Sequence, residues 1–436
     1  PDYYALNIRA WSEFLRTPIV QNAIKKYCVW VVGSGLTLQA EPKTLVLKDL
    51  GITVSDDEAK KFTTSIEGQF RLYVEMLEST YSNENNLQDE ASEALKNAIL
   101  SGDVLCINRF DGKHTTIETI DGRNVQSPMF EAFEQKAEKR GNKLIQGVEI
   151  DKKGSHYAYY VRQEDGSYEQ VLAFGKETGI RQAWLMYGQK GKKSDVRGLS
   201  LLSSIMEFIA KLDRYTEATV GSAEHNANIA MTIEHNQFSD GSNPFINQLA
   251  QSYGKGKGTA PETKSYDACE NGNTATKIAQ DTESTVYNMP TGASLKTHTG
   301  GGDIKFGEFY TPSIELVYST IGMPPEVASD KYEGSYSSSR AALKSWEHKL
   351  KVDRKKILER QFYRPFYSFW LDINVIQGNI NITGYLMALA EGNSMALAAY
   401  KNSRFIGSLV PHIDPWKEVK AAREKLGEKF KDVPLD

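Results

Sequence analysis

A glycine- and lysine-rich stretch, Gly188–Ser194 (GQKGKKS), comes nearest in this sequence to a nucleotide-binding loop. A phosphate-binding loop of the pattern G-x-x-x-x-G-K-[ST] has its first glycine five residues before the second, so that successive backbone amides converge on one anion. Met186 occupies that position before Gly191, and the spacing therefore fails. Because isolated Gly/Lys clusters are usually solvated turns, we expect an exposed basic loop here rather than a nucleotide site.

The residue types that most often hold metals or act as nucleophiles are scattered along the chain. The seven histidines form no HExxH pair and show no other metal-ligand spacing. The cysteines Cys28, Cys106 and Cys269 form no C-x-x-C pair and are expected to be reduced and partly buried. A serine cluster between positions 335 and 339 lacks the G-x-S-x-G elbow, and capping of the next helix suits it better. We expect no metal, no cofactor and no enzymatic activity.

A basic helix is expected over roughly 338–362. Between positions 340 and 364 there are nine lysines and arginines and three acids, a local excess of 9 − 3 = 6 positive charges. Such a charged helix face is usually solvated. The alternative, which the acidic balance of the whole chain supports, is that the helix meets phosphate or an acidic neighbouring subunit. The residues that would do so are Arg340, Lys344, Lys351 and Lys355.

Composition restricts the class of protein further. The 436 residues are 40% hydrophobic, 25% charged and 10% aromatic, which is typical of a folded chain of about three structural units. Fifty-two basic against 56 acidic residues give a net charge of 52 − 56 = −4, which does not support tight, sequence-reading DNA binding. No apolar run approaches the roughly 20 residues that span a bilayer, so we expect a soluble intracellular protein. Because the chain starts at Pro1 without methionine, we also expect a leading segment to be missing.

The elements that position these residues follow from hydrophobic periodicity. In the first block, 1–198, apolar residues at helical spacing predict helices over 6–15, 19–27, 62–77 and 88–99, and short apolar runs between turn residues then predict strands over 104–107, 115–120, 148–150, 157–161 and 171–173. The apolar residues of 199–227 recur with a helical period and predict a long amphipathic helix. Ser200, near its start, is a natural N-cap. A second helix ends at Gly322, and Pro312 either starts or kinks it. The segment 236–302 between them is rich in Gly, Ser, Thr and Asn.

Several segments taken in order resemble one protein family. The most specific is GMPPEVASDKYEGSYSSSR (322–340), which is followed by the basic helix and RPFYSFWL. Others are VVGSGLTLQA (31–40), GVEIDKKGSHYAYYV (147–161), VRGLSLL (196–202) and IDPWKEVKAA (413–422). In content and order they are similar to the lambda-type portal proteins of tailed bacteriophages. The segment 236–302 and the Pro324–Pro325 pair depart from the family pattern.

The resemblance implies an α+β portal-type subunit with an α/β wing, a two-helix stem, a small α/β clip, a tunnel loop and a helical C-terminal crown. Assigned in chain order, these are wing 1–198, stem helix 199–227, clip 228–302, second stem helix 303–323, tunnel loop 324–338, long basic helix and return to the wing 339–382, and crown 383–436. The tunnel loop would bring Lys331, Tyr332, Ser335 and Tyr336 to the DNA channel, and the clip would dock partners through Lys255 and Lys257. The alternative for 324–338 is a connector between wing and stem with Tyr332 and Tyr336 buried.

The implied function is to form the ring-shaped channel at one capsid vertex through which double-stranded DNA is packaged and ejected. The implied partners are other copies of the chain in a dodecamer, double-stranded DNA passing non-specifically, the terminase large subunit, head-completion and connector proteins, and the major capsid and scaffold proteins, with no membrane. The protein would lie in the virion, and in host cytoplasm during assembly. Two alternatives stay open: another ring-forming connector or scaffold, and a nucleotide-using packaging enzyme, which would need the phosphate loop that the sequence lacks.

Overall fold

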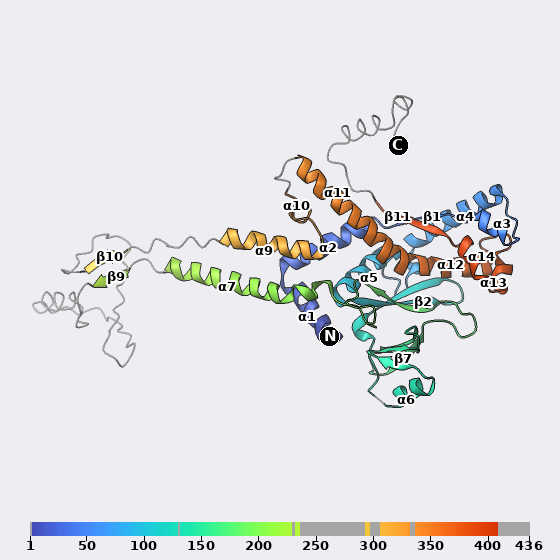
Figure 1. Cartoon of the computed structure of the whole chain (residues 1–436), viewed down its shortest axis with the longest axis horizontal. Helices are drawn as coiled ribbons and strands as arrows, with labels where there is room; N and C mark the ends of the chain where they lie inside the picture. Colours follow the sequence, from blue (N-terminus) through green and yellow to red (C-terminus); the bar gives the residue numbers. More distant parts are fainter. Residues whose placement is uncertain are drawn as a thin grey trace, which may run out of the picture. The chain divides into compact units, whose positions relative to one another are not determined.

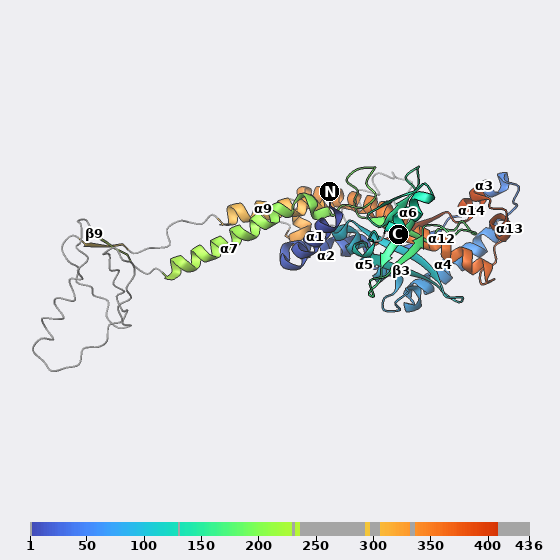
Figure 2. The same cartoon turned by 90° about the horizontal axis from the view of Figure 1, so that it is seen from below.

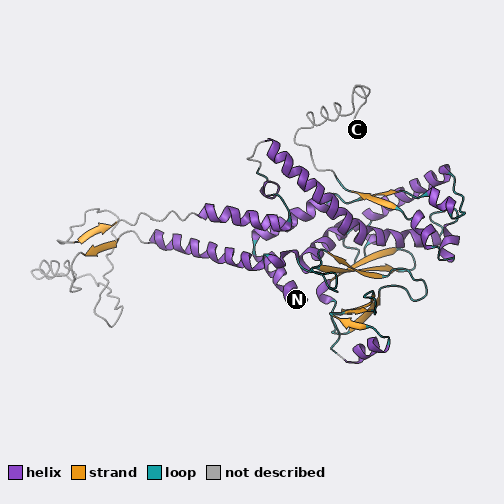
Figure 3. Cartoon of the chain, viewed as in Figure 1, coloured by secondary structure: helices purple, strands orange, loops and turns teal. Residues whose placement is uncertain are grey.

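The computed structural model describes residues 2–129, 131–228, 232–235, 293–296, 306–331 and 336–408. The chain divides into two compact units. Unit 1 comprises Pro1–Asp213 and Tyr310–Asp436, and unit 2 comprises Arg214–Phe309. Unit 1 combines helices with small antiparallel sheets, which confirms the expected α+β class (Figure 3). The predicted sites at Lys255 and Lys257 lie outside the described residues, as do Tyr332 and Ser335.

The first part of unit 1 is mostly helical, and local sequence signals account for the helix ends. Asp2 accepts hydrogen bonds from the first amides of α1, Pro18 occupies the first turn of α2, and Ser55 with Glu58 forms a capping box at α4. The helices predicted over 6–15, 19–27, 62–77 and 88–99 are confirmed, and the structure adds a short helix over 44–49 that the sequence did not predict. Their bounds are α1 (Tyr3–Arg16), α2 (Pro18–Val32), α3 (Thr44–Asp49), α4 (Asp56–Glu75) and α5 (Leu87–Ser101).

A three-stranded antiparallel sheet follows, in the order β3-β2-β8. Figure 1 labels its central strand, β2. Its bounds are β2 (Asp103–Phe110), β3 (Thr115–Asp121) and β8 (Ala183–Tyr187). The central strand β2 is buried on both faces, with Val104 and Cys106 in the main helical core and Leu105 and Ile107 in a second core. That second core lies against a four-stranded sheet in chain order, made of β4 (Lys143–Ile145), β5 (Val148–Ile150), β6 (His156–Arg162) and β7 (Tyr168–Leu172). The helix α6 (Glu131–Lys139) precedes that sheet.

The predicted basic helix is part of a longer helical run. Its bounds are α11 (Tyr336–Asp353), the π-helix η4 (Arg354–Tyr363) and α12 (Arg364–Ile376). The π-helix contacts the free edge of β8. There Tyr187 N–H donates to Gln361 Oε1 at 2.9 Å and Gln361 Nε2 donates to Tyr187 O at 3.2 Å. One side-chain amide thus satisfies the backbone groups that another strand would otherwise pair.

The sequence predicted that the residues after 383 are helical, but the structure shows helices followed by a strand. The helices α13 (Tyr385–Ala390) and α14 (Ser394–Tyr400) gather with α3 at one end of unit 1 (Figure 2). Then β11 (Ser403–Ile406) pairs antiparallel with β1 (Thr37–Ala40). The helical prediction was wrong for 403–406. A segment of four residues is too short to show a period, and its partner strand lies more than 360 residues earlier. Residues 409–436 lie outside the described part.

The core of unit 1 joins the two ends of the sequence. Phe70 of α4 makes edge contacts with Tyr367, Trp370 and Phe405, with ring centroids 5.0–6.2 Å apart. Edge-to-face packing at this separation is favourable. Phe366, Tyr367 and Trp370 of the aromatic run after Pro365 are therefore core residues, and the C-terminal helices and the N-terminal helices share one hydrophobic interior.

The long helix expected over 199–227 is confirmed in part. Ser200 accepts a hydrogen bond from Leu202 N–H, but it begins a short 3-10 helix, η3 (Leu201–Ser204), before α7 (Met206–Asn228). The helix α9 (Phe306–Ile321) contains Pro312 internally and ends at Gly322, whose positive φ of 77° favours glycine. In unit 2, Tyr215 stacks on Phe306 at 6.1 Å and contacts Phe309 at 4.5 Å. The described strands there are β9 (Thr232–His235) and β10 (Ala293–Lys296), paired antiparallel.

Candidate DNA-channel residues and the buried Arg197 network

The segment predicted as a tunnel loop is not a loop over its whole length. Residues Pro325–Ser329 form the short helix α10, and Asp330 ends it in the left-handed conformation. Val327 and Ala328 are buried in the main core. The expectation of a loop over 324–338 was therefore wrong for its first half, because Val327 and Ala328 pack in the core beside α2.

Polar contacts with α2 hold α10 in this position. Lys26 Nζ donates to Ala328 O at 2.8 Å and also forms an ion pair with Asp330. Asn22 Nδ2 contacts the same carbonyl at 3.4 Å. The Lys26 ammonium therefore sits at the carboxyl end of α10, where a positive charge is favourable.

Of the four predicted channel residues, Lys331 and Tyr336 fall within the described chain. Lys331 is exposed, and its backbone N–H donates to Glu326 O at 3.1 Å, one residue beyond the anchored helix. Tyr336 is the first residue of α11. The serines at 337–339 consequently lie inside the first turn of α11 and not before it, so they do not cap it as expected. Residues 332–335 between these two points lie outside the described part of the chain.

The four residues predicted on the basic helix lie in different surroundings. Lys344 and Lys351 both contact Glu347, at 3.0 and 2.8 Å, with spacing i,i+3 and i,i+4. These contacts, that of Lys351 first, lower the pKa of Glu347 to about 2. Arg340 is partly buried, and Lys355 is exposed at the rim of a surface cavity. Part of the positive charge counted in the sequence is thus neutralised within the helix itself.

The opposite face of this helix is bound tightly to unit 1. Trp346 and Leu350 are buried, and Trp346 meets Tyr27 of α2 edge-on at 6.2 Å. Arg354 donates from Nε to Val31 O and from Nη2 to Trp30 O, each at 2.8 Å, so its guanidinium satisfies the last carbonyls of α2. Burial lowers the pKa of Arg354. Arg354 therefore has a structural role, which the count of charged residues in the sequence could not reveal.

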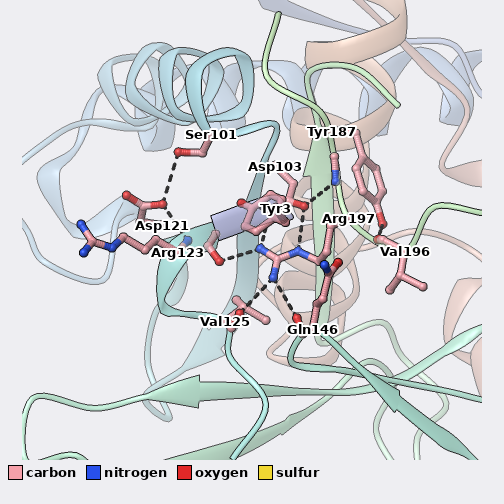
Figure 4. A network of polar contacts seen from close by, with 12 residues as sticks. Tyr3, Ser101, Asp103, Asp121, Arg123, Val125, Gln146, Tyr187, Val196 and Arg197 are labelled. Atoms are coloured by element: carbon pink, nitrogen blue, oxygen red, sulfur yellow. Dashed lines mark hydrogen bonds and ion pairs between the residues drawn. The ribbon is translucent and has the colours of Figure 1, made fainter. Parts of the chain in front are cut away.

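The strongest polar site of the molecule is a buried network around Arg197 (Figure 4). Arg197 Nε and Nη2 donate to the two carboxylate oxygens of Asp103 at 2.9 and 2.7 Å. Its remaining donors reach the backbone carbonyls of Val125 and Gln146 at 2.9 Å and of Gly122 at 2.5 Å. Both charged side chains are at most 2% exposed. The network joins the start of β2, the segment after β3 and the turn between β4 and β5.

The Asp103 carboxylate also receives two further donors. The Tyr3 hydroxyl of α1 donates to Oδ1 at 2.8 Å, and Gly198 N–H donates to Oδ2 at 2.7 Å. Burial raises the pKa of Tyr3, and the Asp103 charge raises it further. Burial acts to lower the pKa of Arg197, but Asp103 outweighs it, and the pKa lies above its usual value. Both groups stay in the protonation state that the hydrogen bonds require.

Two glycines allow this network to close. A Cβ on Gly198 would lie 1.9 Å from Gly102 O, and a Cβ on Gly102, whose φ is +95°, would lie 2.6 Å from the Gly198 carbonyl carbon. Arg197 and Gly198 belong to the quoted segment VRGLSLL, but neither was singled out from sequence. The sequence offered one signal for this network. An Arg-Gly pair precedes a capped helix start, and Gly102-Asp103 precedes a strand.

The described residues do not form an active site of a familiar kind. Among them no group of three His, Cys, Asp or Glu residues is placed to hold a metal ion. Burial raises the pKa of the Cys28 thiol to about 12, which disfavours the nucleophilic thiolate. The loop Gly188–Ser194 is mostly exposed, and Lys190 lies over the ring of Tyr187 at 4.0 Å. In the part of the chain that the structure describes, no helix is long and apolar enough to span a membrane.

Comparison with known families decides what this subunit is. Residues 1–353 match the family model described as phage portal protein, lambda family. The chain belongs to the lambda family of phage portal proteins. The match includes the Arg197 network, α10 and all of α11. No curated protein matches this portal chain.

Solved structures give a likeness of fold for the portal chain. One is from the neck of an empty GTA particle computed with C6 symmetry, with a TM-score of 0.51, 11% identity, and coverage of 100% of this chain and 91% of that chain. Two others are from the virion of a native gene transfer agent (GTA) particle (TM-score 0.49, 11% identity) and from the neck of a native GTA particle computed with C12 symmetry (TM-score 0.48, 12% identity), with the same coverages.

Proposed function

We propose that this portal chain forms a closed ring of identical subunits at one vertex of a capsid, and that double-stranded DNA passes through its axis during packaging and ejection. The observation that carries the proposal is the match of residues 1–353 to the lambda portal family. The likeness of fold to a subunit of a particle neck with C6 symmetry supports it. A ring of twelve identical subunits is compatible with C6 symmetry, because a twelvefold axis contains a sixfold one. A heterologous contact repeated around the axis closes such a ring.

The parts of the subunit follow from this assignment. The wing would be 1–198 with 339–382, the stem α7 and α9, and the clip the residues between them, with Lys255 and Lys257 meeting the terminase large subunit and later the head-completion proteins. The crown would be 383–436, and the major capsid and scaffold proteins would meet the outer surface. The protein would act in the virion, and in host cytoplasm during assembly, without cofactor or bond chemistry.

The channel collar would be the short segment between α10 and α11. The anchoring of α10 by Lys26 and the start of α11 at Tyr336 fix the chain on either side of residues 332–335, which lie outside the described part. Lys331 is exposed at one end of the link. Lysine, tyrosine and serine side chains contact phosphate and sugar without reading sequence, which suits sliding DNA. The basic helix residues Arg340, Lys344 and Lys351 would add weak, salt-dependent attraction.

Electron microscopy of the purified chain, viewed end-on, tests the ring directly. We expect closed rings with a central opening, and light scattering should give a mass many times 48.8 kDa. A stable monomer at micromolar concentration and physiological salt would contradict the proposal. ATP hydrolysis by the pure protein would favour a packaging enzyme instead.

The collar has its own test. Replacing Tyr332 and Tyr336 together with alanine should reduce DNA packaging or retention while ring assembly and thermal stability stay close to the parent. Replacing the buried Tyr385 with phenylalanine serves as the matched tyrosine control, because it alters a core hydrogen bond to Asp372 and not the collar. Loss of several kcal/mol of stability in the double variant would show that the two tyrosines are core residues instead.

A further inference from the structure

The end of α4 carries an exposed apolar ridge that no described residue covers. Leu72, Met76 and Leu77 are 70%, 40% and 50% exposed, although Tyr73 and Val74 between them face the core. Single exposed apolar residues are normal, but three within six positions form a continuous patch. Glu75 and Glu78 stand beside them, exposed. We call Leu72, Met76 and Leu77 with these two acids the α4 ridge.

In the described part of the chain, no ion pair neutralises the charges of the ridge. Among the described residues, no lysine, arginine or histidine lies within ion-pair distance of Glu75 or Glu78. Arg71 is the one neighbouring cation on α4, one turn before Glu75, and it is exposed. The ridge is therefore apolar along one line and acidic beside it.

A cavity of about 470 Å³ opens on another part of unit 1. Its apolar wall consists of Ile180, Pro365, Phe369 and Ala398, and its charged residues are Arg181, Arg364 and Lys401, with no acid among the lining residues. We call it the α12 cavity. Its volume falls in the range of pockets that hold drug-sized molecules, so it has room for two aliphatic side chains.

The cations of the α12 cavity differ in how they are paired. Arg364 contacts Glu359 at 2.9 Å and Lys401 contacts the buried Asp372 at 2.7 Å. Arg181 lies over the ring of Phe174 at 5.4 Å and has no carboxylate partner in the described part of the chain. Lys355 likewise has none there, and it lines the adjoining cavity, which shares Arg364 and Asn402 with this one. Arg181 thus remains available beside the apolar wall, and Lys355 remains available in the adjoining cavity, which also holds the acids Glu41 and Glu359.

The α4 ridge and the α12 cavity lie on opposite sides of α12. Tyr73 of α4 stacks on Phe366 with centroids 6.4 Å apart and contacts Trp370 at 6.0 Å. At 100° per residue, Pro365, Ser368 and Phe369, which line the cavity, lie roughly 105° to 155° around the helix axis from the mean direction of the buried Phe366, Tyr367 and Trp370. The two surfaces of one molecule therefore cannot meet each other.

We propose that the α4 ridge of one subunit docks into the α12 cavity of a second copy of this chain. Leu72 and Met76 would cover the apolar wall, and Glu75 and Glu78 would face Arg181 and Lys355. Because the two surfaces differ and lie on opposite sides, the contact is head-to-tail, which generates a ring where the rotation closes. This inference rests on the proposed ring function and names the surfaces that build it.

Two charge-reversed variants test the contact. The first carries Glu75→Lys with Glu78→Lys, and the second carries Arg181→Glu with Lys355→Glu. Each variant alone juxtaposes like charges at every contact, so we expect each to need about tenfold more protein, or more, for half its chains to enter rings. An equimolar mixture restores opposite charges at every contact of an alternating ring, and should assemble near the parent concentration. Native mass spectrometry should show the two variants in equal numbers in each ring.

The control variant is Glu134→Lys with Glu138→Lys on α6, two exposed acids one helical turn apart in another part of unit 1. It should assemble like the parent. Circular dichroism and melting temperature should be unchanged in all three variants, and rescue by mixing excludes misfolding as the cause of any loss.

The outcomes separate this inference from the proposed function. A parent chain that forms no ring contradicts the proposed function itself. A parent that forms rings while both charge-reversed variants also do so at the same concentration overturns the inference alone, as does loss of assembly that mixing does not restore. The latter result would indicate a different occupant, such as a capsid protein, at one of the two surfaces.

Discussion

Asp103 and Arg197 form a bidentate ion pair in the interior of unit 1, with Nε–Oδ2 at 2.9 Å and Nη2–Oδ1 at 2.7 Å. Every guanidinium N–H of this arginine has an acceptor, and the aspartate also binds Gly198 N–H just before η3 and α7. The pair consequently ties the first turn after residue 198 to the sheet.

Removing one partner of this pair should destabilise the protein strongly. Asp103→Asn leaves Arg197 buried with an uncompensated charge, and we expect a loss of about 3–5 kcal/mol in the free energy of unfolding. Urea denaturation followed by circular dichroism measures it. Glu347→Gln is the matched control: the ion pairs it removes join half-exposed groups, and the loss should stay within about 1 kcal/mol. Equal losses in both variants would contradict the special role of the buried pair.

Gly198 should not tolerate even alanine. The added Cβ would meet Gly102 O at 1.9 Å, a backbone atom that cannot turn away, and the network would have to open. We expect Gly198→Ala to lower the yield of folded protein or the melting temperature clearly. Gly68→Ala in the middle of α4, where a Cβ meets nothing within 4 Å, should instead raise stability by about 0.5–1 kcal/mol. A neutral result at Gly198 would show that the close approach is relaxed in solution.

The half-buried His156 should make stability depend on pH. Burial, followed by the charges of Lys190 and Arg181, lowers its pKa from 6.5 to about 4. Above pH 6.5 the imidazole is neutral in both the folded and the unfolded state, so its contribution to stability is fully present. Between pH 6.5 and 4 the unfolded chain binds a proton that the folded chain does not, and stability falls as the pH is lowered, by at most about 3 kcal/mol.

His156→Gln should therefore flatten the loss of stability between pH 6.5 and 4, as thermal melts at several pH values can show. His348→Gln is the control, because that histidine is exposed on α11. An unchanged slope in His156→Gln would mean that carboxylates alone cause the acid loss.

Lys26 should govern the mobility of α10 more than global stability. Lys26→Met removes the hydrogen bond to Ala328 O and the ion pair with Asp330. We expect faster hydrogen exchange at the amides of Val327 and Lys331, which are bonded within the helix, with a change in unfolding free energy of about 1 kcal/mol or less. Lys25→Met, which removes only a contact with Gln21, should leave exchange at α10 unchanged. Unaltered exchange in Lys26→Met would mean that burial of Val327 and Ala328 alone holds α10.

The sequence alone determined most helices and strands of the subunit, because their signals are local. Helical periods, caps such as Ser55, and Gly322 at the end of α9 act within a few residues, and they fix secondary structure before any tertiary contact forms. The family resemblance was likewise readable, because it depends on short segments kept in order. The charge of the basic helix could be counted, but not which of its residues are paired or buried.

Only the tertiary structure decided the contacts between distant segments. Arg197 and Asp103 are 94 positions apart, and Arg354 caps a helix that ends more than 320 positions earlier. β1 and β11 are each too short to show a period, and they are stable only as a pair. Lys26 could not be connected with α10 from sequence, and neither could the opposite placement of the α4 ridge and the α12 cavity. Side-chain pairing over such distances depends on how the chain packs around one core, which local residue patterns do not encode.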